Sequence, residues 1–219
     1  MRVAVFDLDG TLADTGADLI AAANAALAGR GRPLDPLHER ATAFAGGRAM
    51  LRAGLGPGRE DEVERLFPRL LDAYAGALAV ETRLYDGAEA ALAALDAAGW
   101  RLAICTNKPE GLARALLGAL GVLDRFPVLL GADTLAWKKP DPRHVLEAVA
   151  RSGGRRERAV LVGDTVTDRT AARAAGMPCV LVGFGPGEVA SLAPEAVIGH
   201  FDELPPVLER LVPVSAAGR

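Results

Sequence analysis

Residues 2–12 read RVAVFDLDGTL and join an apolar run to two acidic residues. The run at 3–6 is short and continuous, which predicts a strand buried on both faces. Asp7 and Asp9 follow it one residue apart, and because successive strand side chains alternate between faces, both point roughly the same way. Two carboxylates this close repel each other unless a cation lies between them, and Mg²⁺ favours carboxylate and phosphate oxygens. The alternative is an acidic turn that ends the strand, in which Gly10 supplies a positive φ.

The rest of the chain alternates short apolar runs with helical patterns. We expect further strands at 101–105, 127–130, 159–162, 179–182 and 196–198. This alternation predicts an α/β fold, with a Rossmann-like parallel sheet, right-handed crossovers and helices on both faces. Residues 86–89, DGAE, predict a capping box at the start of a helix that ends near Gly99. The glycine-rich segment at 183–187 is predicted to be a turn.

A long segment after the first strand has no strand pattern. Helical patterns cover 18–27, 35–53 and 60–79, with glycine-rich breaks at 29–33 and 54–58. This length is sufficient for a small helical bundle. We therefore expect two domains, namely an α/β core formed by 1–13 and 84–219 and an inserted helical cap domain formed by 14–83.

The composition of the 219 residues limits the classes of partner that we expect. The net charge is -3 and no basic run appears, so we expect no nucleic-acid partner. No apolar stretch is long enough to span a membrane, and the first strand leaves no room for a signal peptide. Cys105 and Cys179 each lie in an apolar run, which favours buried thiols in a reducing compartment. We expect a cytoplasmic protein that is a monomer or a homodimer.

The basic residues are distributed unevenly. Of the 25 Lys and Arg residues only three are lysines, and all three, Lys108, Lys138 and Lys139, lie in the middle of the chain. A lysine is a compact point charge on a flexible stem, whereas arginine is a wide planar fork. Lysines that are so rare and so close together indicate a function for them at these positions. The alternative is that three residues cluster by chance.

Polar residues follow several of the predicted strands. Asp7, Thr106, Lys139 and Asp164 each lie just after a strand or in the loop beyond one. In parallel α/β sheets ligands bind beyond the carboxyl ends of the strands. We therefore expect these four side chains to converge on one edge of the sheet.

Four segments in this order resemble the motifs of the haloacid dehalogenase-like hydrolases. They are DLDGT at 7–11, TN at 106–107, KP at 139–140 and GDTVTD at 163–168, and the resemblance covers nearly the whole chain. The helical insert lies where that family places its cap domain. Within the family, FDLDGTL at 6–12 and TNKP at 106–109 are most similar to the phosphoglycolate phosphatases.

The resemblance implies a Mg²⁺-dependent phosphate monoester hydrolase. It implies that Asp7 attacks phosphorus and forms an aspartyl-phosphate, while Asp9 protonates the leaving oxygen and then activates water. It also implies that Asp164 completes the Mg²⁺ site with Asp7 and the backbone carbonyl of Asp9. The Thr106 hydroxyl and the Asn107 amide would hold phosphate oxygens.

Three further assignments follow from the same resemblance. Lys139, which directly precedes a proline, is expected to bind phosphate, while its neighbour Lys138 faces away. Asp168 is either a metal ligand or a partner behind the ligands, and the alternative is a carboxylate favoured by the helix dipole. Arg48, after Gly46 and Gly47, is a candidate clamp for a substrate carboxylate. Its alternative is a solvated residue at the start of a helix.

The substrate is expected to be a small phosphate ester, with 2-phosphoglycolate the first candidate. A general sugar-phosphate phosphatase and a phosphomutase share the same motifs and stay open. A dehalogenase would not need the acid Asp9, and a non-catalytic binding protein would be expected to have lost one of the motifs.

Overall fold

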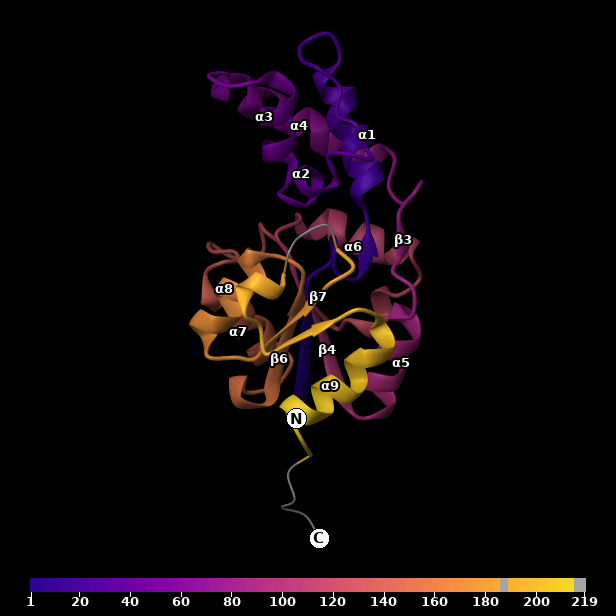
Figure 1. The fold of residues 1–219 in the computed structure, drawn as a ribbon, viewed down its shortest axis with the longest axis vertical. Helices are drawn as coiled ribbons and strands as arrows, with labels where there is room; N and C mark the ends of the chain where they lie inside the picture. Colours follow the sequence, from indigo (N-terminus) through magenta and orange to yellow (C-terminus); the bar gives the residue numbers. More distant parts are fainter. Residues whose placement is uncertain (186–188, 215–219) are drawn as a thin grey trace. The chain divides into compact units, whose positions relative to one another are not determined.

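The computed structural model describes residues 1–185 and 189–214, and its main feature is a six-stranded sheet (Figure 1). Neighbouring strands pair in parallel, which confirms the predicted α/β fold. Across the sheet the order is β5 (Val128–Leu130), β4 (Trp100–Cys105), β1 (Arg2–Phe6), β6 (Ala159–Gly163), β7 (Cys179–Val182) and β8 (Ala196–Ile198).

The first strand of the chain lies in the middle of the sheet. All five residues of β1 are buried, and Val5 lies opposite Ala103 of β4 on one side and Leu161 of β6 on the other. From β1 the chain builds β4 and β5 on one side, then crosses to β6, β7 and β8 on the other. The connections therefore reverse direction between β1 and β6, which is where open α/β sheets bind ligands.

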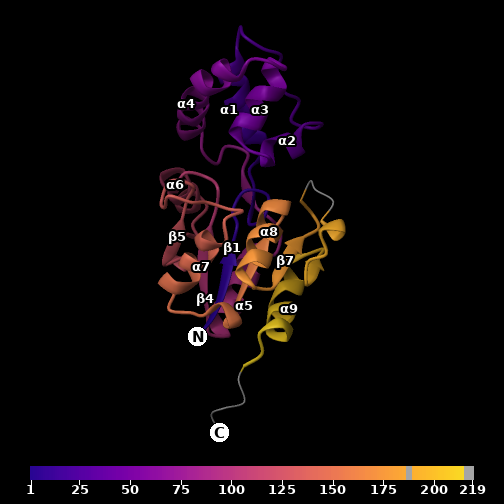
Figure 2. The same ribbon diagram turned by 90° about the vertical axis from the view of Figure 1, so that its left-hand side faces the viewer.

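Helices cover both faces of the sheet. α7 (Pro142–Arg151) and α8 (Val166–Ala175) pack together on one face, whereas α5 (Ala88–Ala97) and α9 (Leu204–Leu211) pack together on the other (Figures 1 and 2). α6 (Glu110–Ala119) packs against β5. Val3 and Val5 belong to the apolar cluster formed with α7 and α8. Burial of this apolar surface is the main force that holds the layers together.

The chain divides into two compact units. We call Met1–Leu12 together with Leu84–Arg219 the α/β unit, and Ala13–Arg83 the helical unit. The helical unit contains α1 (Gly16–Leu27), α2 (Arg40–Phe44), α3 (Gly47–Leu55) and α4 (Glu60–Gly76). These helices enclose their own apolar core, to which Ile20, Leu51 and Leu66 contribute.

Several local expectations need correction. The helical pattern over 35–53 forms two helices, because Gly46 adopts φ 101° between α2 and α3. The capping box expected at 86–89 is wrong, since α5 begins at Ala88 without a side-chain cap. The two-residue strands β2 (Ala13–Asp14) and β3 (Arg83–Leu84) pair with each other and were not expected. Part of the predicted turn at 183–187 lies outside the described residues.

None of the helices within 1–185 and 189–214 has both the length and the hydrophobicity needed to cross a bilayer.

Candidate active site

The Asp7 side chain is fixed at the end of the central strand. Its backbone N–H continues the sheet by donating to the Val162 carbonyl at 2.9 Å. One carboxylate oxygen accepts from the Leu8 N–H at 2.7 Å, and the other lies 3.0 Å from the Lys139 ammonium. Both oxygens therefore contact donors that favour the ionised form.

Lys139 contacts two carboxylates beyond the carboxyl ends of the strands. We call this edge of the sheet and its loops the rim of the α/β unit. Its Nζ lies 2.6 Å from Asp168 and 3.0 Å from Asp7, and its side chain is 1% exposed. Burial alone would lower the pKa of Lys139, but Asp168 and Asp7 outweigh it and raise the pKa above its usual value. Lys138 is exposed, so it is Lys139 that the fold brings into the rim.

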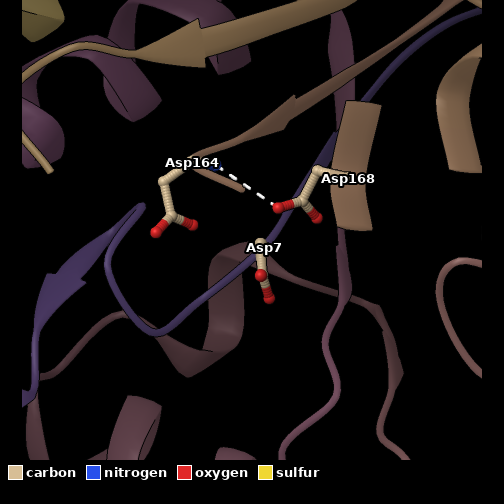
Figure 3. Close-up of side chains that lie close together, drawn as sticks. All are labelled: Asp7, Asp164 and Asp168. Atoms are coloured by element: carbon tan, nitrogen blue, oxygen red, sulfur yellow. Dashed lines mark hydrogen bonds between the residues drawn. The ribbon is translucent and has the colours of Figure 1, made fainter. Parts of the chain in front are cut away.

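Three acidic residues meet beside this lysine. Asp7 from the end of β1, Asp164 after β6 and Asp168 in the first turn of α8 each place an oxygen within 4.8 Å of the others (Figure 3). The Thr11 hydroxyl donates to Asp164 at 2.7 Å. The close packing depends on Gly163, because a Cβ there would lie 2.4 Å from the Asp168 side chain.

The electrostatics of this cluster favour a bound cation. Burial raises the pKa of Asp7 to about 6, with Lys139 opposing the shift and Asp168 adding to it. Burial, together with Asp168 and Asp7, also raises the pKa of Asp164 well above its usual value. Three carboxylates and one ammonium leave an excess of negative charge, which a divalent cation would balance. Carboxylate oxygens are also the ligands that Mg²⁺ prefers, so these residues fit that ion.

Besides its contact with Lys139, Asp168 caps the start of helix α8. One oxygen accepts from Lys139, while the other accepts from the Thr165 hydroxyl at 2.7 Å, the Thr165 N–H at 3.1 Å and the Asp164 N–H at 3.4 Å. Thr165 and Asp168 thereby form the capping box of α8. Both oxygens are already engaged, which favours the role of a partner behind the ligands over that of a direct metal ligand.

The segment after β4 carries Thr106 and Asn107. Thr106 is buried, its N–H donates to the Leu130 carbonyl at 3.0 Å, and its hydroxyl oxygen accepts from the Lys108 N–H at 3.2 Å. The Asn107 amide donates to the Lys139 carbonyl at 2.9 Å. In this arrangement Asn107 ties the lysine loop to the end of β4, a contact that the sequence analysis did not anticipate.

Asp9 has a different partner from Asp7. Its carboxylate lies 2.9 and 3.2 Å from the ammonium of Lys108 and is not part of the three-carboxylate cluster. Gly10 follows with φ 81°, the positive φ expected for the turn. The fold therefore brings Asp7 and Asp9 to the same rim but gives each its own lysine.

Arg48 lies in the helical unit, in the first turn of α3. Its guanidinium forms two hydrogen bonds with Glu64, at 2.7 and 2.9 Å, and stacks 3.8 Å from the Phe67 ring centroid. This matches the alternative of a residue at the start of a helix more closely than that of an unengaged anion clamp. Its contact with substrate stays a prediction.

The sequence analysis assigned no role to three residues of this site. Thr11 holds Asp164, Lys108 holds Asp9, and Thr165 caps α8. The Thr165 cap has a recognisable signature, because T-x-x-D at 165–168 is a capping-box pattern at the start of a helix. Two signals were available for Lys108, namely the clustering of the three lysines and its place in TNKP at 106–109.

The chain has recognisable relatives among known proteins. Residues 1–176 match the family model described as haloacid dehalogenase-like hydrolase. A phosphoglycolate phosphatase from Mesorhizobium japonicum is 43% identical over 218 residues, which cover 96% of each chain.

Two solved structures share the fold. A predicted phosphoglycolate phosphatase from Haemophilus somnus matches with a TM-score of 0.75 and 28% identity, covering 93% of this chain and 96% of its own. The CbbY protein from Rhodobacter sphaeroides, in complex with xylulose-1,5-bisphosphate, matches with a TM-score of 0.77 and 25% identity, covering 94% and 97%.

Proposed function

The chain belongs to the haloacid dehalogenase-like hydrolases as a phosphoglycolate phosphatase-like enzyme, and we propose that it hydrolyses 2-phosphoglycolate to glycolate and phosphate with Mg²⁺. The observation that carries this proposal is the 3.0 Å contact between the Asp7 carboxylate and the Lys139 ammonium. It supports the proposal because a carboxylate that could act as nucleophile and an ammonium that could bind phosphate meet at the switch point of the sheet. The names of the relatives support the substrate.

The first step transfers the phosphoryl group to the protein. An oxygen of Asp7 attacks phosphorus, and the bond between phosphorus and the ester oxygen breaks. The Asp9 carboxyl gives its proton to that oxygen, so that glycolate leaves with a hydroxyl group. The product on the protein is an aspartyl-phosphate at Asp7.

The second step returns the enzyme to its starting state. Asp9, now a carboxylate, takes a proton from a water molecule whose oxygen attacks phosphorus. The bond between phosphorus and Asp7 breaks, phosphate is released and Asp9 regains its proton. The same residue thus acts first as acid and then as base.

The other rim residues would bind the metal ion and the phosphate group of the substrate. Asp7 and Asp164 would hold Mg²⁺, together with the backbone carbonyl of Asp9 as in the family. When bound, this ion supplies positive charge that offsets the repulsion between a carboxylate nucleophile and a phosphate dianion. Lys139 and the Thr106 hydroxyl would hold phosphate oxygens, while Asp168 keeps the ammonium in place.

Phosphate release from a panel of esters tests the proposal. With Mg²⁺, the enzyme should release phosphate from 2-phosphoglycolate faster than from hexose phosphates, and a chelator should stop the reaction. Asp7→Asn should abolish turnover while the circular dichroism spectrum and melting temperature stay close to wild type. Borohydride treatment of acid-quenched enzyme should convert Asp7 to homoserine if the acyl phosphate forms. Turnover by Asp7→Asn at the wild-type rate would remove Asp7 as the nucleophile.

A second candidate is a phosphatase or phosphomutase for sugar phosphates. The observation that favours it is the likeness to CbbY, whose structure contains a sugar bisphosphate. Faster turnover of xylulose-1,5-bisphosphate than of 2-phosphoglycolate would support a sugar-phosphate phosphatase. Conversion of a hexose 1-phosphate to the 6-phosphate without net phosphate release would identify a mutase.

A further inference from the structure

Lys108 is a second buried ammonium at the rim, and the mechanism above does not use it. Its side chain is 4% exposed, and its Nζ lies 2.9 and 3.2 Å from the two Asp9 oxygens. A lysine side chain normally has four flexible torsions. Here burial and the contact with Asp9 hold it in one place.

The backbone around Lys108 is fixed as well. Its N–H donates to the Thr106 hydroxyl oxygen at 3.2 Å, and its carbonyl accepts from the Ala132 N–H at 2.9 Å. A Cβ added at Gly131 would lie 2.8 Å from the same carbonyl oxygen, so the loops after β4 and β5 are in close contact. The side chain is therefore aimed by the fold and not by a mobile loop.

The position of this ammonium is informative because of what Asp9 does. In the proposed first step the Asp9 carboxyl forms a hydrogen bond with the ester oxygen of the substrate. In 2-phosphoglycolate, one methylene group separates that oxygen from a carboxylate. A cation that contacts Asp9 therefore lies within reach of that carboxylate. An alkyl leaving group, by contrast, has no anionic group for this cation to bind.

Two arginines of α3 in the helical unit are already paired with carboxylates. Arg48 is paired with Glu64 at 2.7 Å, and Arg52 is paired with Glu60 at 2.9 Å. The second ammonium at the rim, Lys139, contacts Asp7 and Asp168 and is assigned to the phosphoryl group. Of the two buried lysines at the rim, Lys108 is the one beside Asp9, so its place suits the other end of the substrate.

We propose that Lys108 determines specificity by binding the carboxylate of the leaving group, so that the enzyme selects small phosphate esters with an anionic group beside the ester-bearing carbon. This inference rests on the proposed phosphatase function. In the free enzyme Asp9 is one partner of Lys108, and a carboxylated substrate adds another anion to the same ammonium. The step is binding alone, and no bond is made or broken at Lys108.

Binding of two non-hydrolysable phosphonates separates this role from catalysis. 3-Phosphonopropionate mimics 2-phosphoglycolate, and propylphosphonate has the same length with a methyl in place of the carboxylate. By isothermal titration with Mg²⁺ present, wild type should bind the carboxylated compound about ten- to a hundredfold more tightly. Lys108→Met, which keeps the length of the side chain, should remove most of that difference while affinity for propylphosphonate changes little.

The corresponding kinetic test compares 2-phosphoglycolate with ethyl phosphate. Lys108→Met should lower kcat/KM for 2-phosphoglycolate about ten- to a hundredfold more than for ethyl phosphate. Lys138→Met, which removes an exposed lysine nearby, is the matched control and should leave the ratio unchanged. Lys108→Gln serves as a second variant if the first melts below the assay temperature.

The outcomes separate the two proposals. Equal losses on both esters, with unchanged discrimination between the phosphonates, would show that Lys108 only positions Asp9 and would overturn the inference. Equal binding of both phosphonates by wild type would also overturn it, even with phosphatase activity intact. Absence of turnover on every ester would instead remove the proposed function.

Discussion

The α/β unit and the helical unit use charged residues in different ways. At the rim of the α/β unit, Lys139 and Asp168 form an ion pair whose side chains are 1% and 0% exposed. In the helical unit, Arg48 and Glu64 form a pair of similar length whose side chains are 42% and 56% exposed. Exposed pairs contribute only about 0–1 kcal/mol to stability, while buried charges cost several kcal/mol to desolvate.

This difference distinguishes the site from the rest of the surface. A fold gains little stability from gathering three carboxylates and one lysine in a buried rim, because well-packed apolar residues would serve as well. The arrangement is understandable if the cluster has to bind a phosphate ester and a cation. The Arg–Glu pairs of the helical unit need no such explanation. Substitutions in the two regions should therefore differ in size and in kind.

After Asp7→Asn, which should abolish turnover, the largest effect at the rim is expected at Asp9. Asp9→Asn keeps the volume but loses the acid and base function, so kcat for 2-phosphoglycolate should fall about 10²–10⁴-fold. The loss should be smaller for nitrophenyl phosphate, whose leaving group needs no proton. Steady-state kinetics on both esters provide the measurement. An equal loss on the two would count against the acid role and would make Asp9 a purely structural member of the rim.

The next effect concerns the identity of the phosphate-binding lysine. Lys139→Arg keeps the charge but puts a wide planar fork into a site filled by an ammonium, and kcat/KM should fall about 10²–10³-fold. Lys138→Arg changes an exposed side chain and should be nearly silent. The reverse pattern would transfer the role to Lys138.

Metal binding should stabilise the protein in a way that depends on pH. Burial raises the pKa of Asp7 from 3.8 to about 6, so the metal-free folded state holds this proton more tightly than the unfolded state. The contribution of Asp7 to the free energy of unfolding therefore falls by about 3 kcal/mol as pH rises from about 4 to about 6. Mg²⁺ binds the ionised form, so the stabilisation by Mg²⁺ should grow over the same interval. Melting temperatures with and without Mg²⁺ at about pH 5 and about pH 8 would measure it.

At each pH, the quantity to compare is the increase in melting temperature that Mg²⁺ produces. Burial, with a smaller contribution from Lys139, lowers the pKa of His144 to about 4, which removes stability as pH falls from about 6.5 to about 4. This contribution has the opposite sign but is the same with and without Mg²⁺. Asp164→Asn should reduce the increment at the higher pH. An increment that is larger at the lower pH would contradict a site made of Asp7 and Asp164.

The sequence predicted the parts of the rim that depend on strands. An apolar run buried on both faces specifies a central strand, and parallel strands end on the same edge, so Asp7 and Asp164 could be placed together from the pattern alone. The two-residue strands β2 and β3 escaped prediction, because a pair of residues carries no periodicity.

The pairings of long side chains could not be predicted in the same way. Lys108 and Asp9 are 99 residues apart in the chain, and nothing local shows that they meet. Asp168 was expected near the metal site from the resemblance, whereas its hydrogen bonds to Thr165 and Lys139 depend on how α8 packs beside Gly163. Such contacts depend on the three-dimensional arrangement of neighbouring loops.

The smallest expected effect on stability lies in the helical unit, at Arg48. Because its pair with Glu64 is exposed, Glu64→Gln should change the free energy of unfolding by less than about 1 kcal/mol. Arg48→Ala should cost somewhat more, because the stacking on Phe67 is lost as well. If Arg48 also clamps the substrate carboxylate, Arg48→Ala should raise KM for 2-phosphoglycolate about ten- to a hundredfold and leave KM for ethyl phosphate unchanged. Unchanged KM for both esters would leave Arg48 as a surface residue of α3 and would agree with the proposal that Lys108 binds the carboxylate.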